Sequence, residues 1–170
     1  TEGCKRAPPQ KFPTDTAGAM AEVDRFPFVD RIITHDPYSE IVTECTLSTE
    51  RFPFLADHSI DGTPYHPGVM AMEMFAQSAL LLYPMCILEG FSDVKFGLPI
   101  KLTKEEARIR IKAEFSGQDH NSLFIRCHIE SDLVNSKGEI FGEPRIHHEA
   151  MVRLLKEGAS RDAKIPFTDS

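Results

Sequence analysis

The sequence predicts one α+β domain in which an antiparallel β-sheet wraps around a single buried helix. Two observations support this fold class. The stretch 68–83 is apolar on nearly every face, as expected of a helix that lies inside a fold. After it, three stretches alternate between apolar and polar residues, which is typical of strands with one buried and one exposed face.

The length of 170 residues suits one domain with a hydrophobic core. Residues 1–24 mix proline, glycine and charge without an apolar period, and they predict a linker or a flexible N-terminal segment. The domain itself is expected at 25–157, and 158–170 is expected to form a flexible C-terminal tail. A chain that begins with such a segment is consistent with one domain of a longer protein.

Composition excludes several classes of function. Lys and Arg total 19 against 26 Asp and Glu, and this net charge of −7 argues against a general nucleic-acid binder. No stretch of 18 apolar residues is present, so no membrane span is expected. The cysteines are far apart and lack the CxxC spacing, which favours reduced thiols, a cytoplasmic protein and no zinc site. They are Cys4, Cys45, Cys86 and Cys127.

The first elements follow from β-branched residues and turn signals. The segments 31–35 and 40–48 predict a hairpin, because Asp36-Pro37 and Ser39 lie between them. Three prolines and a glycine make 51–67 a long structured loop. Strong helix formers then fill 68–83, with Pro67 at the first turn, where proline is tolerated.

The second half of the chain predicts four strands. After Pro84 ends the helix and Gly90 closes the connection, the hydrophobic period changes from helical to two. Turns are expected at 117–119 and 135–138, where glycine and polar residues gather. The four strands are predicted at 92–102, 107–115, 123–130 and 146–154.

Polar residues in apolar surroundings indicate a catalytic site. Glu73 and Gln77 lie one turn apart on the buried helix, and a buried carboxyl tends to stay protonated, as a general acid must. His58, in the preceding loop, is a candidate base. The first amides of the helix, at Gly68 and Val69, favour developing negative charge. Together these groups suit proton abstraction next to a carbonyl.

These residues resemble a known family. The run HSIDGTPYHPG, from His58 to Gly68, matches the HxxxGxxxxP signature of dehydratase domains in polyketide and type I fatty-acid synthases. The earlier FPFVDRIITHDP is similar to the opening of discrete 3-hydroxyacyl-acyl-carrier-protein dehydratases, whose ExxxQ matches EMFAQ here. The later DVKFGLPIKL resembles the strand after the helix in dehydratases of polyunsaturated-lipid and hybrid polyketide synthases. The resemblance covers about residues 26–155 and implies the hotdog fold.

The resemblance also implies roles for single residues. His58 would abstract the C2 proton of a 3-hydroxyacyl thioester, and Glu73, held by Gln77, would protonate the departing 3-hydroxyl. The Gly68 amide would bond the thioester carbonyl. Gly62 would let the loop turn, and Pro67 would fix the entry into the helix.

Two points depart from the family. In synthase dehydratases the acid is usually an Asp on a second hotdog, so the chain either pairs with itself and uses Glu73, or forms half of a double hotdog. His66 stands where the family usually has an apolar residue, and it either shapes the substrate entrance or faces solvent.

His147 and His148 lie in an alternating strand, point to opposite faces and therefore do not jointly hold a metal.

The function predicted from these observations is dehydration of a 3-hydroxyacyl thioester to the trans-2-enoyl thioester in fatty-acid or polyketide synthesis. The substrate would arrive on the phosphopantetheine of an acyl carrier protein, with no metal or nucleotide cofactor. A homodimer or a pseudo-dimer with a second hotdog is expected. A hotdog acyl-thioesterase and a non-catalytic half-domain are the alternatives. A basic stripe is a further candidate for docking the acidic carrier. It comprises Lys101, Lys104, Arg108, Arg110 and Lys112.

Overall fold

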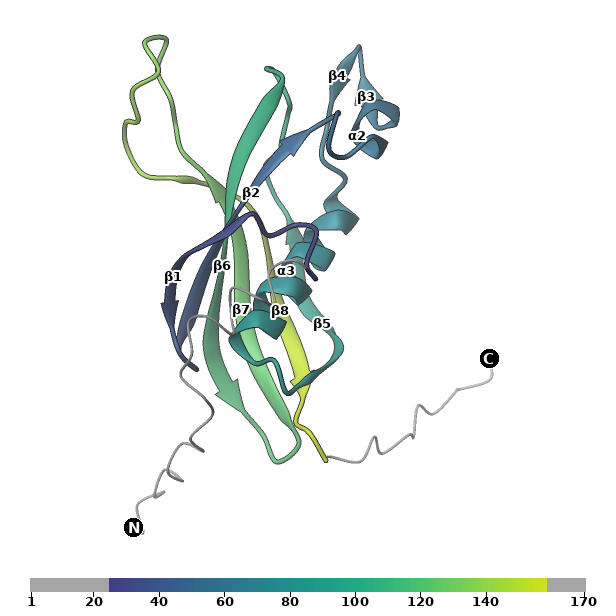
Figure 1. Ribbon diagram of the computed structural model, residues 1–170, viewed down its shortest axis with the longest axis vertical. Helices are drawn as coiled ribbons and strands as arrows, with labels where there is room; N and C mark the ends of the chain where they lie inside the picture. The colour runs from purple at the N-terminus through teal and green to yellow at the C-terminus, as the bar shows by residue number, and fades with distance from the viewer. Residues whose placement is uncertain (1–24, 159–170) are drawn as a thin grey trace.

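A computed structural model describes residues 25–158, which form a six-stranded antiparallel sheet curved around one long helix (Figure 1). The helix, α3 (Gly68–Leu82), packs along most of the sheet, so the sheet wraps it as predicted. The predicted N-terminal segment 1–24 and all but the first residue of the predicted tail 158–170 lie outside the described residues.

The spatial order of the strands is β1-β2-β6-β7-β8-β5. Each neighbouring pair is antiparallel. The strand that follows the helix therefore lies at one edge of the sheet, beside the last strand of the chain. The strands are β1 (Arg31–Asp36), β2 (Glu40–Ser48), β5 (Ile87–Phe96), β6 (Glu106–Gln118), β7 (Ser122–Ser131) and β8 (Arg145–Leu155).

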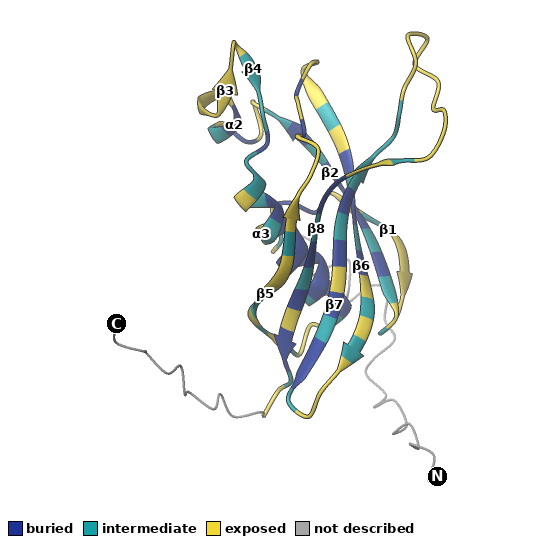
Figure 2. Ribbon diagram, turned by 180° about the vertical axis from the view of Figure 1, so that it is seen from behind, coloured by how far each residue is buried: buried dark blue, intermediate teal, exposed yellow. Residues whose placement is uncertain are grey.

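The predicted hairpin and the alternating strands are confirmed. Strands β1 and β2 pair from Asp36 with Glu40 onward, through a turn in which Tyr38 has a positive φ of 63°. Alternate residues of β2, β6, β7 and β8 are buried against α3, as the burial pattern in Figure 2 shows. These core residues include Ile41, Leu47, Ile109, Ile111, Ile125, Ile129, Val152 and Leu154.

Two polar contacts fix α3 against the sheet. The hydroxyls of Thr43 in β2 and Ser78 in α3 are buried and lie 2.9 Å apart. Beyond the last helical turn, the Tyr83 hydroxyl donates to the Tyr38 carbonyl at 2.6 Å. Buried polar groups of this kind need a partner, and a shift of the helix would leave them without one.

The loop 51–67 contains more regular structure than the sequence predicts. It holds a short helix, α2 (Phe54–Asp57), and two strands of two residues each, β3 (Ser59–Ile60) and β4 (Thr63–Pro64). In Figure 1 these elements lie beyond the N-terminal end of α3. They are too short to show a hydrophobic period, so the sequence gives no signal for them.

The predicted strand 92–102 is wrong in position, because β5 begins at Ile87 and ends at Phe96. Pairing with β8, whose Leu155 meets Ile87, draws the first residues into the sheet. Gly90 lies inside this strand at a register shift, where glycine is tolerated, and does not close the connection. Likewise β6 runs on to Gln118, so the turn predicted at 117–119 starts at Asp119.

Candidate active site

His58 directly follows α2, and its imidazole is exposed. The ring Nδ1 lies 2.9 Å from the carbonyl oxygen of Tyr65. A carbonyl only accepts hydrogen bonds, so Nδ1 must carry the proton. In the neutral ring this tautomer leaves the lone pair on Nε2, as a general base requires.

The loop between His58 and Tyr65 is closed by backbone hydrogen bonds. The Tyr65 amide donates to the His58 carbonyl at 2.9 Å, so these two residues are joined through both backbone and ring. The turn between them has positive φ at Asp61 (49°) and Gly62 (75°). Glycine adopts this conformation without a steric penalty, which fits the turning role predicted for Gly62.

The entry into α3 leaves two backbone amides ahead of the first hydrogen bond of the helix. Pro67 has an extended backbone (φ −63°, ψ 131°). The first hydrogen bond of the helix is donated by the Met70 amide to the Pro67 carbonyl oxygen, at 3.0 Å. The amides of Gly68 and Val69 thus precede the helical ladder. Val69 is 67% exposed, and the ring of Phe96 lies so close to Gly68 that a Cβ there would meet it at 2.9 Å.

Glu73 and Gln77 are brought together on α3, but Glu73 is not buried. Gln77 Nε2 donates to Glu73 Oε1 at 2.8 Å, and Gln77 Oε1 accepts from the Phe28 amide at 3.0 Å. Gln77 is buried, whereas Glu73 is exposed in the described chain. The expectation that an all-apolar helix buries its glutamate is therefore wrong, because no element of residues 25–158 covers this side of α3 near its N-terminus.

His66 is buried, so the alternative that it faces solvent is wrong. Its side chain is 4% exposed, and burial lowers its pKa to about 4, with nearby His148, His58 and His147 adding to the effect. His66, His148, His58 and His147 therefore gather near the entry into α3. Only two members of this group, His58 and His66, belong to the predicted site.

His147 and His148 leave β8 on opposite sides, as alternation predicts, and both are buried. His147 accounts for both ring nitrogens, with Nε2 2.8 Å from Ser131 Oγ and Nδ1 3.0 Å from the Leu98 carbonyl oxygen. Burial lowers the pKa of both rings. His148 shares the core-facing row of β8 with Ala150 and Val152 and meets the Phe96 ring edge-on at 5.7 Å.

Sequence reasoning missed Tyr65, Phe28, Phe96 and His148. The first two contribute backbone groups, which no side-chain pattern reveals. His148 does have a sequence signal, since it is the histidine on the apolar side of an alternating strand. Phe96 has none, because its role depends on where β5 lies against α3.

The basic stripe is largely neutralised by neighbouring carboxylates. Arg110 bonds both Glu130 and Asp132, which holds the pKa of the guanidinium above its usual value. Lys112 lies 2.7 Å from a Glu40 oxygen. Lys101 lies nearer the site than the other members of the stripe that were just described. Its ammonium group is over the Tyr65 ring, 5.4 Å from the ring centre, and its backbone lies next to the His58 loop.

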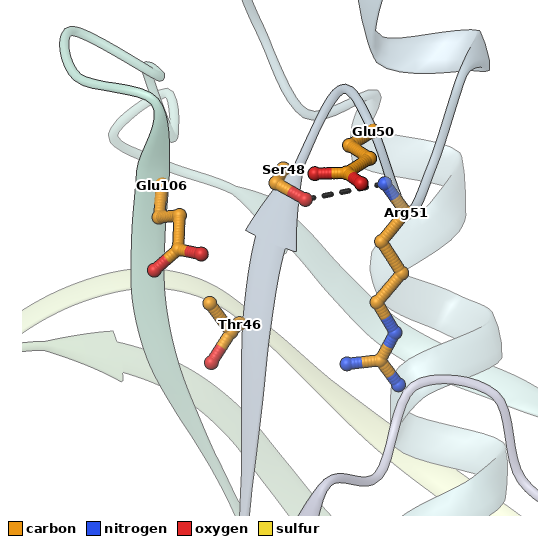
Figure 3. A pocket seen from close by; sticks show the side chains of 5 residues that line it. All are labelled: Thr46, Ser48, Glu50, Arg51 and Glu106. Atoms are coloured by element: carbon orange, nitrogen blue, oxygen red, sulfur yellow. Dashed lines mark hydrogen bonds between the residues drawn. The ribbon is translucent and has the colours of Figure 1, made fainter.

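A polar hollow at the ends of β2 and β6 contains none of the predicted site residues (Figure 3). The Arg51 side chain in this hollow already has two partners: it pairs with the Asp30 carboxylate and donates to the Pro27 carbonyl oxygen at 2.8 Å. We therefore assign no chemistry to it. The hollow is lined by Thr46, Ser48, Glu50, Arg51 and Glu106.

Two negative findings concern residues 25–158 only. No group of three His, Cys, Asp or Glu side chains there is placed to hold a metal ion. No helix in this part of the chain has the length and apolar character needed to cross a membrane.

Comparison with known sequences assigns the family. Residues 27–129 match the polyketide synthase dehydratase domain family. The 3-hydroxyacyl-(acyl-carrier-protein) dehydratase FabZ of Chlamydia trachomatis serovar L2 is 35% identical over 128 residues, which cover 68% of this chain and 82% of that protein.

Solved structures support the hotdog fold at lower sequence identity. The dehydratase heterocomplex ApeI:P from Xenorhabdus doucetiae aligns with a TM-score of 0.54 at 19% identity, over 79% of this chain and 90% of that one. The dehydratase domain of the CurJ module of curacin polyketide synthase aligns with a TM-score of 0.53 at 20% identity, over 80% of this chain but 44% of that one. A thioesterase protein from Streptococcus pneumoniae TIGR4 aligns at 0.55 with 12% identity, over 83% of this chain and 95% of that one. The predicted fold and enzyme family are confirmed, and the chain belongs to the polyketide synthase dehydratase domain family.

Proposed function

We propose that this protein removes water from a 3-hydroxyacyl thioester to give the trans-2-enoyl thioester, with His58 as the base. The observation that carries the proposal is the hydrogen bond between His58 Nδ1 and the Tyr65 carbonyl, in a chain of the dehydratase family. This bond fixes the ring and leaves Nε2 to take the proton from C2. The bond between C3 and its oxygen then breaks as the double bond between C2 and C3 forms.

The entry into α3 supports the developing negative charge on the thioester carbonyl. Abstraction of the C2 proton gives that oxygen enolate character, and a backbone amide at a helix N-terminus stabilises it. The Gly68 amide has this role in the proposal, with Val69 beside it. A donor of this kind contributes about 10²–10³-fold to the rate.

The hydroxyl leaves as water only if an acid supplies a proton. Glu73 is the candidate on this chain, because Gln77 holds its carboxylate at 2.8 Å. An acid works best in a site from which water is excluded, and Glu73 is exposed here. The proposal therefore includes a second hotdog that covers this side of α3.

The edge strand β5 supports such a pairing. As the last strand of the sheet it presents unpaired backbone groups, which make an edge prone to pair with another chain. Apolar side chains are exposed along it and next to it. They are Ile87 (55%), Phe96 (53%), Leu98 (50%) and, at the start of α3, Val69 (67%).

The second hotdog is either another copy of this chain or a neighbouring domain. The chain spans 90% of an ApeI:P chain and 82% of FabZ, which suits pairing with a second copy of itself. It spans 44% of the CurJ and CurF dehydratase domains, which suits one half of a double hotdog. The first case uses Glu73, and the second uses a carboxyl outside this chain.

The remaining parts of the proposal concern context. The substrate is carried on the phosphopantetheine arm of an acyl carrier protein, and the protein groups named above supply the chemistry without a metal or nucleotide. The domain is proposed to extend over 25–157 and to act in the cytoplasm. The three cysteines that the structure describes are free thiols, which supports a reducing compartment.

The deciding experiment follows the products from 3-hydroxyhexanoyl-N-acetylcysteamine by mass spectrometry. Enoyl thioester identifies a dehydratase, and its loss in His58→Ala identifies the base. Free acid with free thiol would instead identify a thioesterase. No turnover would favour a half-domain without its own acid.

A second experiment locates the acid. In a homodimer that uses Glu73, Glu73→Gln retains an acceptor for Gln77 but loses the acidic carboxyl proton, and dehydration should fall by about 10²–10⁴-fold. Glu139→Gln, on an exposed loop, is the matched control. Full activity in Glu73→Gln would place the acid on another domain, and light scattering would show whether the active species is a dimer.

A further inference from the structure

Two buried histidine rings beside the proposed site lack a hydrogen bond of ordinary geometry within residues 25–158. His66 and His148 are each 4% exposed. None of their four ring nitrogens makes a hydrogen bond of ordinary geometry with a described residue. The His148 ring lies within reach of the His147 backbone, which offsets part of the effect of burial on its pKa. The neighbouring His147 has partners for both of its nitrogens, so the lack of partners is specific to this pair.

The two rings are neutral, and each offers one donor and one acceptor. Burial lowers the pKa of both, for His66 to about 4, so neither is charged near pH 7. A neutral imidazole carries one N–H and one bare nitrogen. Leaving such groups unpaired in an apolar core costs free energy, and apolar side chains of similar size would avoid that cost. The pair therefore has a use that a purely structural core would not need.

The pair lies on the side of the sheet that faces α3, near the proposed thioester site. His148 belongs to the core-facing row of β8, and His66 directly precedes Pro67, which caps the helix. Phe96 connects the two places, because its ring meets His148 edge-on at 5.7 Å and lies against Gly68. An acyl chain whose carbonyl bonds the Gly68 amide therefore begins beside these rings.

Phe96 lies against His148 and Gly68, at the open side of the pair. Its side chain is 53% exposed at the end of an edge strand, so turning it out breaks few contacts. Once the ring has turned, an acyl chain at Gly68 meets the His148 and His66 nitrogens. Methylene groups there would leave the nitrogens unpaired, whereas a hydroxyl both donates and accepts and would pair with them.

We infer that His66 and His148 bind an oxygen substituent of the acyl chain beyond the 3-hydroxyl and thereby select oxygenated chains over plain fatty acyl chains. The inference rests on the proposed dehydratase function. It adds a class of substrate, because polyketide-type chains carry oxygen at alternate carbons whereas fatty acyl chains do not. His66 and His148 act as specificity-determining residues and take no part in proton transfer.

The test compares two N-acetylcysteamine thioesters of equal chain length, 3-hydroxyhexanoyl and 3,5-dihydroxyhexanoyl. The wild-type protein should show a kcat/KM for the dihydroxy substrate that is higher by about tenfold or more, since a missing hydrogen-bonding group leaves buried polar atoms unpaired. His66→Leu and His148→Phe should abolish this preference and raise activity on 3-hydroxyhexanoyl. His66→Gln, which keeps a donor and an acceptor, should retain part of the preference.

His128→Gln is the matched control, because this histidine lies on β7, is half-buried and contacts Glu130. It should leave both substrates unchanged. Circular dichroism of each variant shows that the fold is retained. Equal kcat/KM for the two substrates in the wild-type protein would overturn the inference and indicate that a trapped water pairs with the rings.

A binding measurement separates this inference from the proposed function. The unreactive 5-hydroxyhexanoyl and hexanoyl thioesters are titrated into the wild-type protein and His148→Phe by calorimetry. A preference for the hydroxylated ligand that depends on His148, without any turnover, supports the pair and contradicts the dehydratase proposal for the isolated chain. Turnover without a preference contradicts the pair alone. No preference in either measurement overturns the inference.

Discussion

The ring of His58 is exposed and hydrogen-bonded, whereas the rings of His66 and His148 are buried and make no hydrogen bond of ordinary geometry in the described part of the chain. All three lie near the entry into α3. The bond to Tyr65 fixes the tautomer of His58 and leaves its other nitrogen open to a substrate. Burial keeps the other two rings neutral, so they offer hydrogen bonds instead of charge. The difference separates the proposed proton transfer from the proposed choice of substrate.

The largest expected effect comes from His58→Ala. Loss of the base should lower kcat for dehydration by about 10²–10⁴-fold. Because the ring is exposed, the melting temperature should change little. Enoyl formation and thermal unfolding, measured on the same preparation, check both expectations. His35→Ala, on the exposed strand β1, is the control. More than a tenth of wild-type activity in His58→Ala would contradict its role as the base.

The buried rings should make stability depend on pH. The pKa of His66 is about 4 in the folded protein against 6.5 as the ordinary value, so the unfolded chain binds more protons between these values. The contribution of neutral His66 to stability is therefore fully present above pH 6.5. It is lost as the pH falls from 6.5 towards 4, which lowers the free energy of unfolding by about 3 kcal/mol. Urea unfolding at pH 7 and pH 4.5 measures this loss.

His66→Leu should flatten the pH dependence, and His58→Ala should leave it in place. An unchanged slope in His66→Leu would show that other groups dominate acid unfolding. The pair of variants thus tests whether the buried ring and the exposed ring differ in the way the structure indicates.

Gln77→Leu removes a buried side chain whose oxygen and nitrogen each have a hydrogen-bond partner, in contrast to the ring nitrogens of the buried histidines. The change leaves the Phe28 amide without its acceptor at 3.0 Å and Glu73 without its donor. We expect a loss of about 1–3 kcal/mol in unfolding free energy. Gln118→Leu, at the exposed end of β6, should stay within about 0.5 kcal/mol. Equal effects of the two would show that the Phe28 contact contributes nothing.

The last comparison concerns two glycines that lie next to Phe96, and it includes the smallest expected effect. At Gly97 a Cβ would lie 2.7 Å from the backbone oxygen of His147, which cannot give way, so Gly97→Ala should cost about 1–3 kcal/mol. At Gly68 the added Cβ would meet the movable Phe96 ring, so Gly68→Ala should change stability by less than about 1 kcal/mol. Urea unfolding of both variants checks the order, and a larger loss in Gly68→Ala would contradict a mobile Phe96.

Much of the fold could be predicted because its core strands and helix have strong periods. The alternation around Ile109 and Ile125 and the uninterrupted apolar run of α3 leave little choice of element type. The start of β5 could not be predicted. It depends on pairing with a strand more than fifty residues later, and Gly90 gives a misleading local signal.

The site could be predicted where side chains carry a motif and not where backbone or burial decides. His58, Gly68 and Gln77 could be named from the motif, and their catalytic roles stay a prediction. The exposure of Glu73 could not be read from α3, because an apolar helix does not reveal which of its faces a second domain covers. The tautomer of His58 depends on a carbonyl seven residues away, and carbonyls have no sequence signature.

The position of β8 determines when this protein becomes competent during its synthesis. Strand β5 directly follows α3, but within residues 25–158 it pairs only with β8, the strand of this sheet that is synthesised last. His148 is also on β8, so neither the edge that carries Phe96 nor the buried pair exists until about residue 155 is available. Contacts of such long sequence separation slow folding. The nascent chain therefore leaves this side of α3 uncovered until β8 is available. A truncation within β8 is expected to remove the edge, the buried pair and part of the covering of α3 together.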